Sequence, residues 1–122
     1  MSRESKPLDF VGTARDDLRG FSRPVRIIIG VALAEAQRGL KHPDAKLLRG
    51  FKGASVLEVV ANFDGDTYRA VYTVRLVHAI YVLHCFQKKS THGVATSARD
   101  IDLIERRLRM AEAIDRAKGT AS

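Results

Sequence analysis

The sequence predicts an α+β fold in which N-terminal helices pack on one face of a small antiparallel β-sheet and a C-terminal helix follows. Three observations support this prediction. Apolar residues recur at helical spacing over residues 24–38, change to strand spacing over 55–89, and return to helical spacing after Ser97. No repeat or linker interrupts this order, and 122 residues suit one core. We therefore expect one domain over residues 1–122, with the helices on one sheet face and the other face partly open.

The N-terminal third predicts a short strand and two helices. Residues 8–11 are typical of a strand, and residues 14–20 of a short helix that ends at Gly20. Ser22 and Pro24 then introduce a longer amphipathic helix over residues 24–38, closed by Gly39. Its apolar positions recur at helical spacing: Val25, Ile28, Ile29, Ala32, Leu33 and Ala36.

The middle of the chain predicts three antiparallel strands joined as a meander. Residues 56–60 are rich in β-branched side chains, and Asp64-Gly65 is a hairpin-turn sequence. Residues 67–76 alternate between polar and apolar, and residues 79–86 form a third apolar and aromatic run.

The final helix is predicted from its capping residues and its apolar face. Thr96 and Ser97 precede it as candidate N-caps, and Asp100 and Asp102 lie in its first turn. The apolar face comprises Ile101, Ile104, Leu108 and Ala111.

The charge indicates a polyanionic partner, with nucleic acid as the first candidate. The formal charge is 21 − 14 = +7. Residues 67–99 contain five basic residues and no acidic one, so most of this excess lies in one stretch. Exposed basic residues that merely solubilise a sheet edge are the alternative.

Cysteine and histidine usage argues against disulfides and metal sites. One cysteine, Cys85, cannot form an internal disulfide, and the four histidines lack metal-ligand spacing. The polar N-terminus is unlike a secretory signal, and no apolar run is long enough for a membrane span. We expect a cytoplasmic protein that needs no metal or cofactor.

Three segments resemble a known toxin family. Residues 67–74, Thr-Tyr-Arg-Ala-Val-Tyr-Thr-Val, and residues 79–90, Ala-Ile-Tyr-Val-Leu-His-Cys-Phe-Gln-Lys-Lys-Ser, resemble the YRxVYxV and YxLHxFxKKS patterns of the RelE/ParE toxin superfamily. Residues 45–51, Ala-Lys-Leu-Leu-Arg-Gly-Phe, resemble the AKxLxGF segment of its HigB-like, phage Gp49-like branch. The resemblance covers residues 8–112.

This resemblance implies the toxin of a type II toxin–antitoxin system with a RelE-like microbial RNase fold. The implied activity is metal-independent cleavage of mRNA on the ribosome by attack of the 2′-hydroxyl, which inhibits translation and growth. The implied partners are the mRNA, the ribosome and a cognate antitoxin, which in this branch often carries a helix-turn-helix.

The family's functional positions are only partly present. The arginine of the YRxVY strand is Arg69, and the basic residue after the last strand is Lys89, with Lys88 beside it. Glu58 stands among apolar residues where some RelE toxins carry paired lysines, and no tyrosine follows Tyr81. The usual threonine-proline step before the last helix is Thr96-Ser97 here.

The residue types suit RNA cleavage without a metal. Arg69 can bind phosphate oxygens bidentately, and Lys88 and Lys89 can bracket the same phosphate. His92 is a candidate proton shuttle because imidazole titrates near neutrality, and Glu58 is a candidate base.

Each candidate also has a structural alternative. Arg69 could form a surface salt bridge with Asp64 or Asp66, His92 could be merely solvated, and Glu58 could be a structural partner of Arg69 or Lys46. His84 is expected to be a core or half-buried histidine with a backbone partner. The candidate residues for RNA or ribosome binding, with solvated loop or core positions as their alternative, are Lys41, Lys46, Arg49, Lys52, Arg75 and Tyr72.

Two other functions remain open at this point. The same fold occurs in ParE-like proteins that inhibit DNA gyrase and have no nuclease activity, but these do not need clustered phosphate-binding cations beside Arg69. A non-catalytic RNA-binding module is the third hypothesis, and the missing tyrosine favours it.

Overall fold

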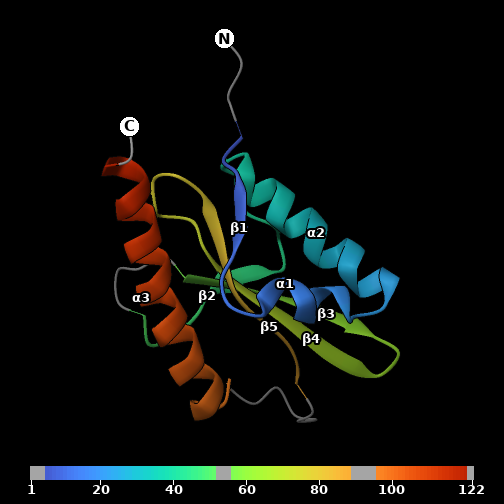
Figure 1. The fold of residues 1–122 in the computed structure, drawn as a ribbon. Helices are drawn as coiled ribbons and strands as arrows, with labels where there is room; N and C mark the ends of the chain where they lie inside the picture. The colour runs from blue at the N-terminus through green and yellow to red at the C-terminus, as the bar shows by residue number, and fades with distance from the viewer. Residues whose placement is uncertain (1–4, 52–55, 89–95, 121–122) are drawn as a thin grey trace.

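The computed structural model describes residues 5–51, 56–88 and 96–120 and confirms the α+β class (Figure 1). The candidate residues Lys52, Lys89 and His92 lie outside the described residues. In chain order the elements are β1 (Leu8–Phe10), α1 (Ala14–Arg19), α2 (Arg23–Gln37), β2 (Ala45–Leu47), β3 (Val56–Phe63), β4 (Asp66–Thr73), β5 (Ile80–Lys88) and α3 (Ala98–Thr120).

The sheet has five strands in the order β1-β5-β4-β3-β2. The predicted antiparallel meander β3–β4–β5 is confirmed, and Asp64 (φ 53°) and Gly65 (φ 82°) form its first turn, as the Asp-Gly sequence predicts. Two edge strands complete the sheet. The predicted strand β1 joins β5 in parallel, which makes the sheet mixed rather than purely antiparallel. The sequence did not predict β2, a three-residue strand antiparallel to β3.

Helices cover both faces of the sheet, so the expectation of a partly open second face was wrong. Helices α1 and α2 pack on one face and α3 packs on the other (Figure 1). The strands are apolar on both faces, because Tyr72 packs toward α2 whereas Val71 and Tyr81 pack toward α3. Ile104 and Ala111 of α3, both fully buried, close the second face.

A buried carboxylate holds the C-terminal end of α3 against the β4–β5 connection. Asp115 accepts hydrogen bonds from the backbone N–H groups of Val77 (3.0 Å) and His78 (2.8 Å) and from the Tyr81 hydroxyl (2.9 Å). Burial alone would raise the pKa of Asp115, but these hydrogen bonds hold that pKa below its ordinary value. Lys118 and Asp9 add an ion pair between α3 and β1.

A β-bulge in β5 decides where His84 points. Val71 pairs with His84 but its neighbour Tyr72 pairs with Val82, so Leu83 is an extra residue on β5. Leu83 packs in the cluster under α3, and His84 also reaches α3, where it contacts Asp100. The bulge therefore places two consecutive side chains on the same face.

No helix in residues 5–51, 56–88 or 96–120 is both long and apolar enough to cross a membrane.

Candidate functional site

A row of aligned residues crosses four strands on the sheet face that α3 covers. Lys46 of β2 pairs with Glu58 of β3, Glu58 pairs with Val71 of β4, and Val71 pairs with His84 of β5. Side chains on a strand alternate between faces, so Arg69 of β4 shares this face with Val71. The row places a carboxylate between cationic side chains.

Glu58 is the centre of this site. It is 2% exposed, and each of its carboxylate oxygens has one partner. Arg69 Nη1 donates to Oε1 at 2.8 Å, and Thr96 Oγ1, just before α3, donates to Oε2 at 2.9 Å. Arg69 thus pairs with Glu58 and not with the turn residues Asp64 or Asp66. This arrangement holds the carboxylate in one orientation.

Two cationic groups beside Glu58 have unused hydrogen-bond donors. Arg69 Nε and Lys88 Nζ are shielded from solvent and lack a hydrogen-bond partner among the described residues. Burial and then the nearby charge of Arg69 lower the pKa of Lys88, and the charges of Glu58 and Asp100 offset part of this shift. Buried donors are nearly always satisfied, so unused ones at a cationic site favour an anionic ligand.

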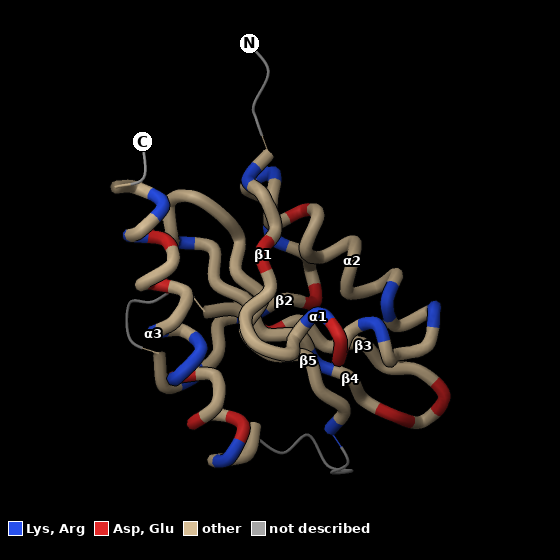
Figure 2. Tube along the Cα trace, in the orientation of Figure 1, with Lys and Arg blue, Asp and Glu red and all other residues tan. Residues whose placement is uncertain are grey.

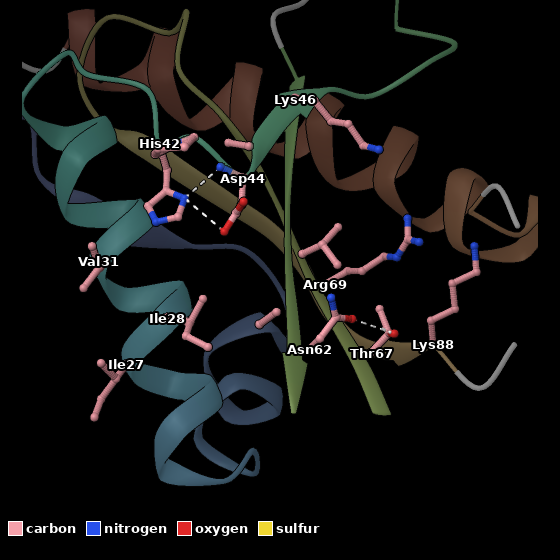
Figure 3. Close-up of a pocket in the computed structure, with 14 residues that line it drawn as sticks. Ile27, Ile28, Val31, His42, Asp44, Lys46, Asn62, Thr67, Arg69 and Lys88 are labelled. Carbon is pink, nitrogen blue, oxygen red and sulfur yellow. Dashed lines mark hydrogen bonds and ion pairs between the residues drawn. The ribbon is translucent and has the colours of Figure 1, made fainter. Parts of the chain in front are cut away.

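The cations line an open groove with a volume of about 980 Å³ along β3. In Figure 3, Lys46, Arg69 and Lys88 point toward one another on one side of β3, and Ile27, Ile28 and Val31 of α2 lie on the other side. Figure 2 shows basic and acidic positions interleaved along α3. The cations of the groove, Lys46, Arg69 and Lys88, all belong to strands (β2, β4 and β5), so its positive charge comes from the sheet.

A histidine–carboxylate pair, which the sequence did not predict, adjoins the site, and the expectation that His84 has a backbone partner was wrong. His84 Nε2 lies 2.8 Å from Asp100 Oδ1, and Ser97 Oγ donates to Asp100 Oδ2 at 2.7 Å. The His84 ring stacks on Phe86 with 4.4 Å between the ring centroids. Sequence alternation could not reveal this pair, because the bulge, and not the alternation, turns His84 toward α3.

The structure brings together four of the candidate residues, namely Glu58, Arg69, Lys88 and Lys46. Arg49 and Arg75 are exposed but do not line the groove.

Tyr72 is fully buried on the face toward α2, and burial together with the charge of Glu35 raises its pKa to about 12. It therefore lies on the opposite face of the sheet from Arg69.

The arrangement suits the binding of a phosphate group and a displacement reaction at its phosphorus atom. It combines a fixed carboxylate, a guanidinium and an amine, which can accept a proton, neutralise charge and release a proton. Among the described residues, no group of three or more histidine, cysteine, aspartate or glutamate side chains could hold a metal ion.

Comparison with known proteins identifies the family. No curated protein sequence matches the chain. The chain matches the family described as "Phage derived protein Gp49-like (DUF891)" over residues 16–109, which include Glu58, Arg69, Lys88 and the first turn of α3. That span exceeds half of the 122 residues. The chain belongs to the Gp49-like family of RelE/HigB-like toxins, whose members act in toxin–antitoxin systems and have an antitoxin as partner.

Proposed function

We propose that this toxin is a metal-independent endoribonuclease that cleaves mRNA on the ribosome and so inhibits translation and growth. The observation that carries the proposal is the fixed Glu58 carboxylate beside two shielded cationic groups with unused donors, Arg69 Nε and Lys88 Nζ. A phosphodiester supplies the anionic oxygens that such donors accept. Membership of a toxin family supports the proposal, because cleavage of mRNA would stop growth.

Each group has a role in the proposed reaction. Glu58 takes the proton of the 2′-hydroxyl, and the resulting O2′ attacks the adjacent phosphorus. Arg69 and Lys88 stabilise the added negative charge on the phosphorane. The bond from phosphorus to O5′ then breaks, Lys88 gives a proton to O5′, and a 2′,3′-cyclic phosphate and a 5′-hydroxyl remain. A lowered lysine pKa eases release of that proton.

Residues outside the core of the site extend the proposal. Lys46 and Arg49, which are both exposed, are proposed contacts with ribosomal RNA, because cations bind phosphate backbones without needing a particular sequence. Lys52 remains a predicted contact of the same kind. Lys89 and His92 remain predicted as a second phosphate contact and a proton shuttle. An antitoxin with a helix-turn-helix and a cytoplasmic location also remain proposals.

Primer extension on cellular mRNA after a brief induction of the toxin tests this function. We expect new 5′ ends inside translated frames for the wild type, and their loss for Glu58→Gln and Arg69→Ala. Arg109→Ala, which removes an exposed arginine of α3, is the matched control and should cleave like the wild type. Growth arrest with intact transcripts and DNA damage would instead assign the protein to gyrase inhibition.

A further inference from the structure

The outer edge of β3 is only half covered. Strand β2 pairs with residues 57–59, and residues 60–63 have no partner strand on that side in the described part of the chain. Leu48 N–H donates to Val56 C=O at 2.9 Å, so the main-chain groups of Val56 face outward. Those of Val60 and Asn62 face the same way, because the direction alternates along a strand. Residues 60–63 include neither proline nor a charged residue, which are the residue types that usually protect a free strand edge from pairing.

The groove along this edge has two chemically different walls. On the side of α2 the wall is apolar, and Ile27 and Val31 are 54% and 47% exposed. On the other side it carries Lys46, Arg69 and Lys88 (Figure 3). A strand added to β3 would direct its side chains alternately to the two walls, because successive side chains point to opposite faces.

We infer that this edge is the docking site of the antitoxin, which adds an extended segment to β3 with apolar residues toward α2 and acidic residues toward the cations. Main-chain hydrogen bonds to Val60 and Asn62 would supply affinity, and the two walls would select the alternating pattern. The inference rests on the proposed function in one respect: the acidic side chains would use the donors that RNA phosphates need, so docking would block cleavage.

Charge decides between the possible occupants. A second copy of this chain, with a net charge of +7, would bring the same cations toward each other across a β3–β3 contact. RNA complements the cations but not the open main-chain edge or the apolar wall of α2. An extended acidic and apolar polypeptide complements all three features.

Hydrogen–deuterium exchange of the toxin–antitoxin complex against the free toxin tests the inference directly. The antitoxin used is the protein whose co-expression restores growth to cells that express the toxin. We expect exchange at the amides of Val60 and Asn62 to slow by about tenfold or more on complex formation.

Two variants of the groove and one control variant test which residues contribute to antitoxin binding. Val60→Pro removes an outward N–H without touching the ladder to β4, and Ile27→Glu places a negative charge on the apolar wall. Each should weaken antitoxin binding by about fivefold to tenfold. Met110→Glu changes an exposed apolar residue of α3 (49% exposed) and should bind like the wild type. Ile27→Glu lies on a helix surface, so it keeps the test valid even where Val60→Pro impairs folding.

Other footprints would overturn the inference. Slow exchange elsewhere, with unchanged affinity of both groove variants, would place the antitoxin on another surface. Protection of residues 60–63 in the free toxin that rises with its concentration would assign the edge to a second copy. Protection by an RNA oligonucleotide but not by the antitoxin would assign it to RNA. A toxin that fails to cleave RNA but shows the expected footprint would refute the proposed nuclease and leave the docking site standing.

Discussion

His84 of β5 and Asp100 in the first turn of α3 lie 2.8 Å apart and join the sheet to the helix beside Glu58. Thr96, four residues before Asp100, donates to the Glu58 carboxylate. The segment from Thr96 to Asp100 therefore bonds both to the proposed base and to a buried histidine. The same ring has a second nitrogen, Nδ1, that is shielded and lacks a partner among the described residues.

Asp100→Asn should lower both stability and cleavage. The change removes the charge that faces His84, and we expect a loss of about 1–2 kcal/mol in the free energy of unfolding, because Asp100 is partly exposed. The first turn of α3 would hold Thr96 less firmly against Glu58, so kcat should fall more than KM rises. Urea unfolding and single-turnover cleavage measure the two effects. The control is Asp102→Asn, which removes the charge of an exposed carboxylate two residues further along α3. A variant with normal kcat would show that the pair serves stability alone.

The pH dependence of cleavage should report on Lys88. Its pKa is lowered by burial and by Arg69, so Lys88 should lose its proton at a lower pH than an ordinary lysine, whose pKa is 10.5. A reaction that needs protonated Lys88 should therefore decline on the alkaline side before an unshifted lysine would titrate. Lys88→Arg keeps its charge and should lose this alkaline decline, with a lower maximal rate. An alkaline limb that persists unchanged in Lys88→Arg would remove Lys88 from the role of proton donor.

Asp115 should make the fold sensitive to acid. Because its folded-state pKa lies below the ordinary value of 3.8, the unfolded chain binds more protons in that range. Its contribution is therefore fully present above the ordinary pKa and is lost as the pH falls through the lowered one. Asp115→Asn, which leaves one of three donors poorly satisfied, should lose about 1–3 kcal/mol at pH 7 and show a shallower acid dependence. Urea unfolding from pH 2 to pH 7 measures both, and an unchanged slope would contradict the role given to Asp115.

Cys85 should be inert in the folded protein. It is buried among apolar residues, and burial followed by the charge of Asp17 raises its pKa to about 12, with Arg107 offsetting part of the shift. The thiolate is the reactive form, so iodoacetamide at pH 8 should label Cys85 only after unfolding. Mass spectrometry with and without denaturant checks this. Rapid labelling of the native toxin would show that the core beneath α1 opens readily.

The sequence by itself predicted every helix and strand except β2, and it supplied the candidate residues of the site. The helical period over residues 24–38, the Asp64-Gly65 turn and the capping residues before α3 each depend on neighbours in the chain, so local pattern was enough to predict them. Strand alternation, which is also local, accounts for Arg69 sharing a sheet face with Val71. Residue type alone predicted that Glu58, Arg69 and Lys88 suit phosphate chemistry, but not how they are arranged.

Only the tertiary structure decided which of these residues meet. The parallel pairing of β1 with β5 and the packing of α3 on the second face join segments that are not neighbours in the chain, and their stability comes from burial that no local pattern reports. Strand β2 pairs with the next strand, β3, but its three residues are too few for a strand pattern. The bulge at Leu83 turned His84 toward Asp100, and the short length of β2 left Val60 and Asn62 on an open edge. The pairing partners of side chains and main-chain groups depend on register, and register is set by the packing of the whole sheet between its two layers of helices.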